Sequence, residues 1–387
     1  MKGGFHEAFK LSATGSSMQD TVNRAPDALE SGACAPACDK ARAVSAVSLA
    51  RLDACLAGLR FDPDDPRSLG EAFTQLIDGG FDRLPLPGRG ATLERWRCLA
   101  AVAARDLGLA KLFEGHTDAL AILAELGGPP ARPASRWAVW AAQAPDARVQ
   151  AVRVETRFAT LSGVQTWGSG AQAVTDALVV AWLDGEPWLA AVPMGGPRTA
   201  SSTERWHAVG MRATASADVR FENAPAVLVG APHAYVRRPG FWHGGAGIAA
   251  CWFGAAAGLA RRLREAVAAR PDPHRLAHLG AADVALAGAA ALLRETARLI
   301  DANPNADLQA AALQARLCVE ATVDSVLASV GRALGAAPYC RDAAFARALA
   351  DLPVFVRQSH AERDLAALGE AVAQDAGCAE GELRWTL

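Results

Sequence analysis

The segment 157–192 constrains the fold most, because its apolar residues follow the short period of β-strands and not the period of helices. Apolar runs at 178–180 and 188–189 flank the pair Asp184-Gly185. An Asp-Gly pair between two apolar runs is typical of a tight hairpin, since the turn needs residues that tolerate positive φ. Most of the sequence before and after this stretch has helical periodicity instead. We therefore expect β-structure enclosed by two helical blocks.

The length and charge of the chain limit what it does. With 387 residues, of which 51% are hydrophobic and 21% charged, it has the composition of an ordinary soluble globular protein with a large core. The formal charge is −2 and Lys and Arg are scattered, so binding to nucleic acid is not expected. No uninterrupted apolar run reaches the roughly 20 residues of a membrane span, and the N-terminus has no apolar signal core. We predict a cytoplasmic protein without membrane contact.

Breaks in the periodicity divide the chain into five segments. The first lacks sustained periodicity and is expected to be mobile, and the last is a short tail. Between them, Gly127-Gly128-Pro129-Pro130 ends the first helical block, and Pro239 precedes the second. The predicted segments are a leader (1–44), an N-terminal helical domain (45–134), a middle β-domain (135–238), a C-terminal helical bundle (239–376) and a tail (377–387).

Long apolar helices are expected in the second helical block. The patterns predict helices over 241–269, 276–300 and 307–334, followed by shorter ones over 343–349 and 354–373. Such helices in antiparallel order form a bundle. The first of them contains five glycines. Because each glycine costs roughly 1 kcal/mol in a helix interior, they indicate the close approach of a neighbouring helix or of a flat ligand.

Two stretches of the β-region resemble sequence words of the acyl-CoA dehydrogenase family. Residues 161–171 read L-S-G-V-Q-T-W-G-S-G-A and residues 173–181 read A-V-T-D-A-L-V-V-A, similar to the phrase that runs through the family's middle domain. Residues 210–221, G-M-R-A-T-A-S-A-D-V-R-F, are similar to a second word at the family's spacing. The resemblance implies an α+β fold with an N-terminal helical domain, a middle β-barrel or sandwich and a C-terminal four-helix bundle. It also implies a flavin-dependent oxidoreductase.

The resemblance implies that FAD, or alternatively FMN, lies in a crevice between the β-domain and the C-terminal helices. Trp167 would flank the flavin ring, and Gly168 with Ser169 would offer a backbone N–H and a hydroxyl to its edge. Donors at that edge stabilise the charge that develops on reduction. The alternatives are that Trp167 is a core aromatic and that Ser169 belongs to a turn at the end of a strand.

The second word contributes three more polar residues. By the resemblance, Arg212, Thr214 and Ser216 would lie on the following strands, near the cofactor phosphate or the substrate entrance. Arginine suits a phosphate because its guanidinium presents a fixed fork of donors. The alternative is that Arg212 is exposed on a strand without a ligand.

Other words of the family are incomplete in this chain. At the entry to the β-domain, residues 141–146 read A-A-Q-A-P-D and lack the hydroxyl and glycine positions that contact flavin in the family. Near Arg332, only Gly335 matches the word that binds the adenine half of flavin from a neighbouring subunit. Arg270 fits the start of a third word, but Pro273 stands where phenylalanine is expected. The resemblance makes Arg270, Arg332 and Gly335 candidates for cofactor binding with partial matches.

The catalytic base of the family is missing from its usual place. Acyl-CoA dehydrogenases remove the α-proton of a thioester with a glutamate in a dry pocket, where its pKa rises. Here no glutamate stands between Asp342 and Glu362, and none stands near Gly247, the other location used in the family. The resemblance therefore leaves the chemistry open.

Three interpretations follow. In the first, His360 or Glu362, with Ser359 beside them, supplies a displaced base for α,β-dehydrogenation of an acyl thioester or a related substrate. In the second, the protein resembles the flavin-dependent monooxygenases of the same fold, with His116, Ser169 and His360 around the flavin. In the third, the protein is a catalytically silent structural relative without flavin, and His360 belongs to a solvated helix face.

The resemblance also implies partners. These are acyl-CoA or another small-molecule substrate, an electron-transfer partner or a supplier of reduced flavin, and further copies of the chain in a homodimer or homotetramer. A metal site is not expected. Cys34 and Cys38 lie close together in the sequence, but a metal would need two further ligands nearby.

Overall fold

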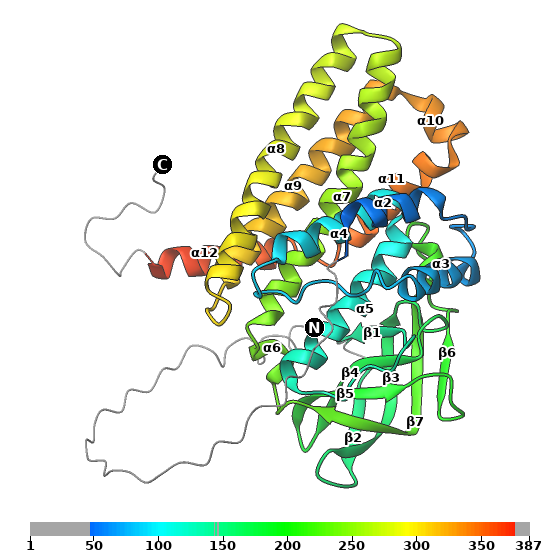
Figure 1. The fold of residues 1–387 in the computed structure, drawn as a ribbon, viewed down its shortest axis with the longest axis vertical. Coiled ribbons are helices and arrows are strands. Elements are labelled where there is room, and N and C mark those ends of the chain that lie inside the picture. Colours follow the sequence, from blue (N-terminus) through cyan, green and yellow to red (C-terminus); the bar gives the residue numbers. More distant parts are fainter. Residues whose placement is uncertain (1–46, 143, 145–146, 376–387) are drawn as a thin grey trace, which may run out of the picture. The chain divides into compact units, whose positions relative to one another are not determined.

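Four helices open the described part of the chain (Figure 1). The computed structural model describes residues 47–142, 144 and 147–375, so the predicted leader and tail, with Cys34 and Cys38, lie outside the described residues. Asp106 separates the third of these helices from the fourth, and its carboxylate accepts the Leu109 N–H at 2.9 Å as an N-cap. The helices are α2 (Leu49–Gly58), α3 (Pro66–Asp78), α4 (Thr92–Arg105) and α5 (Leu107–Leu126).

A closed β-barrel follows, and it contains the predicted hairpin. The hairpin turn at Asp184 and Gly185 has φ angles of 52° and 85°, as expected for this pair. The strands are β1 (Trp137–Trp140), β2 (Val149–Arg153), β3 (Phe158–Gly168), β4 (Asp176–Leu183), β5 (Glu186–Pro193), β6 (Thr199–Ser202) and β7 (Ala217–Val229). Five of them close a ring, because β4 pairs with β2 and β5, β3 pairs with β2 and β7, and β5 pairs with β7.

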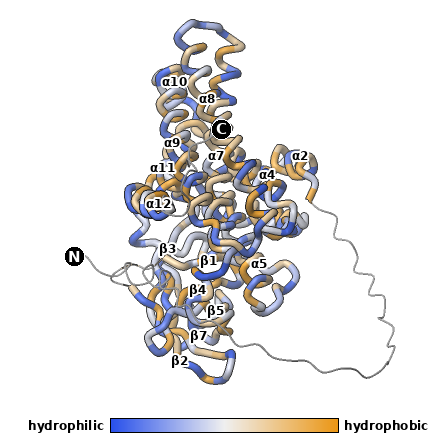
Figure 2. The backbone as a smooth tube through the Cα atoms, turned by 90° about the vertical axis from the view of Figure 1, so that its left-hand side faces the viewer, coloured by the Kyte–Doolittle hydropathy of each residue, from blue (hydrophilic) through white to orange (hydrophobic). Residues whose placement is uncertain are grey.

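The other described residues form helices, of which the three longest, α7 to α9, extend away from the barrel (Figures 1 and 2). The helices are α6 (Ala234–Arg237), α7 (Gly240–Ala269), α8 (Pro273–Ala302), α9 (Gln309–Leu334), α10 (Ala336–Arg341), α11 (Ala343–Val356) and α12 (Glu362–Asp375). Helix α7 packs against α4, α8 and α9. The described residues belong to one compact unit, and their division into three domains stays a prediction.

One predicted helix boundary was wrong. The sequence suggested that a helix ends at Leu349 and another begins at Val354, whereas α11 continues through Pro353 to Val356. Proline disfavours a helix interior because it lacks an N–H. Here Leu352, Phe355 and Val356 are buried, so packing of this last turn outweighs that penalty. The chain breaks instead at residues 357–361.

The glycines of α7 serve helix packing. A Cβ atom at Gly254 would lie 2.1 Å from the Ala100 carbonyl oxygen, and one at Gly258 would lie 3.3 Å from the Ala104 oxygen. Only residues without a side chain allow α7 and α4 to approach this closely. Of the two explanations for these glycines, a neighbouring helix therefore accounts for Gly254 and Gly258.

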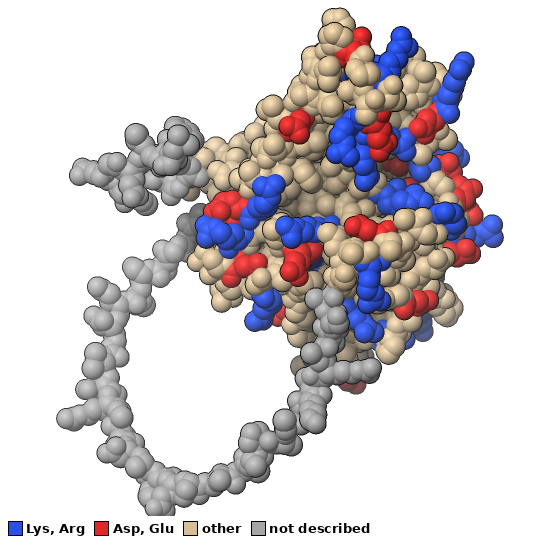
Figure 3. Space-filling model, turned by 45° about the horizontal axis from the view of Figure 1, so that its top comes forward, with Lys and Arg blue, Asp and Glu red and all other residues tan. Residues whose placement is uncertain are grey.

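Helix α8 is unusual among the described helices, since it alone is long and apolar enough to cross a membrane by length and composition. Its most apolar window has a mean hydropathy of 1.7, and only 17% of that window is buried. Val284 on this helix is 74% exposed. The outer face of α8 is thus an extended apolar surface of small residues. Elsewhere, Figure 3 shows positive and negative side chains interspersed, without a field of one sign on the face in view.

Candidate functional site

The end of β3 presents an exposed indole. Trp167 has a φ of 58° and is 57% exposed, whereas Trp140 on the neighbouring β1 is 3% exposed. A tryptophan normally buries most of its large apolar surface. An exposed indole on a strand end with left-handed backbone is therefore available to stack against a flat ligand.

Ser169, two residues after this indole, is joined to two further hydroxyl groups from a distant stretch of the sequence. Ser169 Oγ lies 2.8 Å from Ser216 Oγ, and Ser216 Oγ lies 3.0 Å from Thr214 Oγ1. Thr214 Oγ1 donates to the Met211 carbonyl at 2.8 Å, and the Gly170 N–H donates to the Thr214 carbonyl at 2.8 Å. We call Ser169, Thr214 and Ser216 the hydroxyl cluster. The structure thus brings together the two stretches of sequence that carried the resemblance.

The backbone around this cluster differs from the predicted strand. Arg212 and Thr214 form a short 3-10 turn, η1 (Arg212–Thr214), and β7 begins only at Ala217. Met211 and Ala215 flank the turn with φ angles of 58° and 43°, a conformation that breaks an extended strand. Arg212 is exposed and makes no ion pair with any residue that the structure describes.

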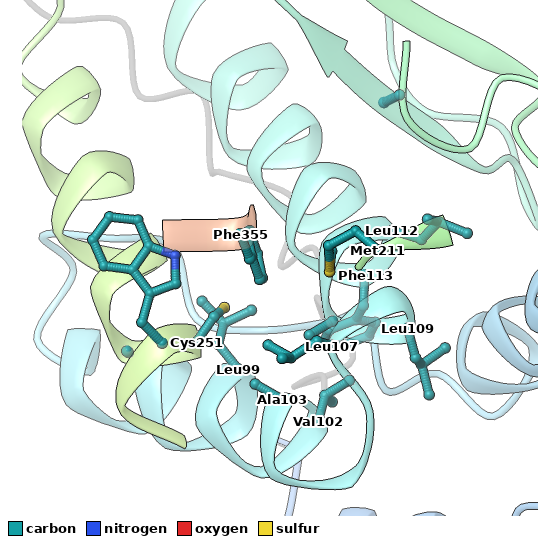
Figure 4. Close-up of a cluster of buried hydrophobic side chains, with 14 of the residues drawn as sticks. Leu99, Val102, Ala103, Leu107, Leu109, Leu112, Phe113, Met211, Cys251 and Phe355 are labelled. Atoms are coloured by element: carbon teal, nitrogen blue, oxygen red, sulfur yellow. The ribbon is translucent and has the colours of Figure 1, made fainter. Parts of the chain in front are cut away.

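A buried carboxylate ties η1 to α11. The Met211 N–H donates to Asp351, and Gly210 packs against the Ala350 backbone. Burial raises the pKa of Asp351 to about 6, although the Met211 N–H and the Arg347 guanidinium act in the opposite direction. In Figure 4, Met211 lies among buried side chains that include Phe355 of α11. The hydroxyl cluster is therefore anchored to the helix that leads into residues 357–361.

Three of the predicted catalytic residues follow α11. Ser359 is buried, and its Oγ accepts the Ala361 N–H at 3.3 Å. The His360 ring is half exposed, with Nδ1 3.3 Å from Asp364 Oδ1, and its backbone N–H donates to Asp364 Oδ2 at 3.1 Å. Burial alone would raise the pKa of Asp364, but these hydrogen bonds outweigh it and lower that pKa. Glu362 is exposed in the first turn of α12.

His116, the fourth predicted catalytic residue, is buried on α5 and has both ring nitrogens engaged. Nδ1 accepts the Trp137 N–H at 3.0 Å, so the proton belongs on Nε2, which lies 3.3 Å from Asp82 Oδ2. The ring borders a pocket of about 300 Å³ between α3, α5 and residues 131–135. In this arrangement His116 has no free lone pair to act as a base, and its catalytic role stays a prediction.

The remaining predicted cofactor residues lie elsewhere. Arg270 caps the C-terminus of α7, Arg332 is in the last turn of α9, and Gly335 follows it with a φ of 67°. These helix ends are at the far end of the helices from the barrel (Figure 1). Within one chain, the structure does not bring them near Trp167.

Sequence reasoning missed several charged side chains buried among the helices. Glu114 of α5 is 6% exposed and pairs with Lys111 at 3.1 Å. Burial raises the pKa of Glu114, and the Lys111 ammonium partly offsets this rise. Arg95 of α4 and Arg316 of α9 are also buried, and burial lowers the pKa of each guanidinium. Their only signal in the sequence is a charge on an otherwise apolar helix face.

A metal centre finds no support in the described residues. No group of three or more His, Cys, Asp or Glu side chains there could hold a metal ion. The pair Cys34 and Cys38 lies outside these residues.

Comparison with known proteins gives matches in structure alone. No family model matches the chain, and no curated protein matches it. Methanesulfinate monooxygenase MsuC from Pseudomonas fluorescens superposes with a TM-score of 0.70 at 19% identity, over 85% of this chain and 97% of MsuC. Dibenzothiophene monooxygenase TdsC from Paenibacillus sp. A11-2 gives 0.70 at 17% identity, over 84% and 96%.

A third similar structure contains a flavin. KijD3 in complex with FMN and dTDP-3-amino-2,3,6-trideoxy-4-keto-3-methyl-D-glucose gives a TM-score of 0.68 at 20% identity, over 87% of this chain and 92% of KijD3. TdsC has also been solved with FMN and indole. At these identities the likeness establishes the fold. The chain therefore has the acyl-CoA dehydrogenase-type fold, which it shares with flavin-binding oxidative enzymes.

Proposed function

We propose that this protein is a monooxygenase that uses reduced FMN supplied by another protein to oxidise a small molecule. The observation that carries the proposal is the exposed indole of Trp167 at the end of β3, two residues before Ser169 of the hydroxyl cluster. A flat apolar surface beside hydroxyl groups suits a flavin, whose ring is flat and whose edge carries hydrogen-bonding atoms. MsuC and TdsC, which share the fold, are monooxygenases.

FMN is favoured over FAD for two reasons. The residues that would bind an adenine half, Arg332 and Gly335, match the family word only in part and lie far from the barrel within one chain. The structures of KijD3 and TdsC contain FMN. We therefore infer that the barrel end accommodates a flavin mononucleotide.

The residues of this chain would have distinct tasks. Reduced flavin supplies the activation of dioxygen, with one oxygen atom transferred to the substrate and the other released as water. Trp167 would cover one face of the ring and exclude water. Because Thr214 donates to the Met211 carbonyl, Ser216 must donate to Thr214 and Ser169 to Ser216. Ser169 Oγ would therefore accept a hydrogen bond from an N–H at the edge of the reduced ring. His360, oriented by Asp364, would exchange a proton with the substrate.

Isotope labelling tests this function. We would supply photoreduced FMN and ¹⁸O₂ to the protein with methanesulfinate, dibenzothiophene or indole as probes. The proposal expects one ¹⁸O atom in the product of at least one probe. This labelling should be absent when the protein is left out of the reaction. If the protein binds FMN but no probe is labelled in its presence, the monooxygenase proposal is contradicted and the protein is a flavoprotein with another activity.

Dehydrogenation is the second candidate, and Glu114 favours it. Residues 343–361 contain no glutamate, and Glu362 is exposed, whereas a base for thioesters needs a dry environment. Glu114 is buried with a raised pKa, as such a base requires, although it pairs with Lys111. Anaerobic bleaching of bound flavin by butyryl-CoA, lost in Glu114→Gln, would establish this activity in place of monooxygenation.

We also propose that the protein is a homo-oligomer in which another copy covers α8. The apolar window of this helix is 17% buried within one chain. Burial of such a surface stabilises association by roughly 25 cal/mol for each Å² removed from water. A second copy is the simplest partner that supplies a matching apolar surface.

A further inference from the structure

Arg316 links three separate parts of the structure. Its Nη1 donates to the Gly245 carbonyl of α7 at 2.8 Å, and its Nη2 donates to the Gln358 carbonyl at 3.0 Å. The guanidinium carbon lies 5.0 Å from the centre of the Trp252 ring. The side chain is buried and makes no ion pair with a carboxylate in the part of the chain that the structure describes. One guanidinium of α9 thus joins α7 to the segment between α11 and α12.

Packing alone does not account for a charge at this position. A buried guanidinium loses hydration, and the loss is offset only where its donors are satisfied. Burial lowers the pKa of Arg316, and the carboxylates of Asp364, Glu320 and Glu114 oppose this from a distance. An apolar side chain of similar size would fill the same space without that cost. What only arginine provides is a rigid fork with two donors for two carbonyl oxygens.

The segment that Arg316 holds is also hydrogen-bonded to the end of α11 and the start of α12, but Arg316 is what connects its Gln358 carbonyl to α7. Arg357 pairs with Glu320 of α9, and the Ser359 N–H donates to the Val356 carbonyl at 2.8 Å. Ala361 has a φ of 48°, which turns the chain into α12. Between these points, Arg316 donates a hydrogen bond to the carbonyl of Gln358, two residues before His360. Asp364 holds the His360 N–H from α12, and the hydrogen bond of Arg316 connects this segment to α7.

We propose that Arg316 is a positioning residue that holds residues 357–361 against α7 and thereby places His360 for proton exchange. The first statement, that Arg316 holds residues 357–361, concerns the polypeptide alone. The second, that this contact places His360 for catalysis, rests on the proposed function of His360. The two measurements below test these statements separately.

The first measurement is hydrogen–deuterium exchange of the full chain without added flavin. In Arg316→Met, we expect amides of residues 357–364 to exchange at least tenfold faster, while peptides from α7 and α9 change little. Arg264→Met is the matched control, since Arg264 is exposed on α7 and should leave exchange unchanged. Unchanged exchange at 357–364 in a folded Arg316→Met protein would overturn the proposal, whatever the function of the enzyme.

The second measurement is a double-mutant cycle on turnover. We expect Arg316→Met to lower kcat at least tenfold with KM and FMN affinity within twofold, and Arg316→Lys to recover part of the loss because lysine keeps a donor. In a His360→Gln background the same Arg316→Met change should have less than a threefold effect. Equal effects in both backgrounds would show that Arg316 does not act through His360. If Arg316→Met fails to fold, both experiments are made with Arg316→Lys in its place. Exchange at 357–364 and kcat that both equal those of the wild type would then overturn the proposal.

Discussion

At the scale of single residues, Ser169 and Ser216 depend on each other, because one hydrogen bond of 2.8 Å joins their hydroxyls. Ser169→Ala should weaken FMN binding about fivefold, since a hydrogen bond is worth about 1 kcal/mol. Ser216→Ala should have a smaller effect in the same direction, because Ser169 would keep its hydroxyl and lose only its orientation. Fluorescence titration with FMN measures both. Ser162→Ala, on β3 outside the cluster, is the control, and an equal loss there would argue against a specific contact.

Asp351 makes stability depend on pH. Its pKa is raised by burial to about 6 from an ordinary value of 3.8. The folded protein therefore binds a proton before the unfolded chain does as pH falls, and the stability linked to this group increases between about pH 6 and pH 4. Relative to Asp351→Asn, which cannot titrate, the wild type should gain up to about 3 kcal/mol over that window. Urea unfolding at several pH values measures the difference, and parallel profiles would contradict the assignment.

At the scale of elements, the contact of α7 with α4 depends on glycine. Gly254→Ala should lower the free energy of unfolding by about 1–3 kcal/mol, because its Cβ would lie 2.1 Å from the Ala100 oxygen. Gly369→Ala in α12 is the matched control, since nothing lies within 4 Å of its Cβ position. This control should gain up to about 1 kcal/mol from helix propensity. Thermal unfolding of both variants checks the pair, and a stabilised Gly254→Ala protein would refute close packing.

Periodicity and turn residues in the sequence predicted most helices and strands. These predictions were wrong where contacts with residues far away in the sequence determine the local structure. The Asp184-Gly185 hairpin and the long helices follow from turn chemistry and periodicity, which act over a few residues. The 3-10 turn at Arg212 depends on Asp351, more than a hundred residues away, and α11 passes Pro353 because of its buried last turn. The indole and hydroxyls of the site were identified by resemblance. The role of Arg316 was not, because its carbonyl partners are visible only in three dimensions.

At the scale of the whole molecule, the outer face of α8 should decide assembly. Val284→Glu places a charge on this apolar face, where Val284 is 74% exposed, and we expect it to reduce the oligomer to a smaller species. Val152→Glu is the control, since Val152 is 65% exposed on β2 of the barrel. Light scattering after size exclusion gives both masses. A wild type that is already monomeric would contradict the proposed assembly.

The central claim is that the barrel end binds a flavin on Trp167, and titration of FMN against this indole tests it most directly. Stacking of a flat heterocycle on an aromatic side chain contributes about 1–3 kcal/mol. Trp167→Ala should therefore raise the Kd for FMN by about 5- to 150-fold. Phe158→Ala, at the opposite end of β3 and 53% exposed, should leave it unchanged. The account predicts saturable FMN binding that is weakened in Trp167→Ala and unchanged in Phe158→Ala. A wild type that does not bind FMN, or a Trp167→Ala protein that binds it equally well, would contradict it.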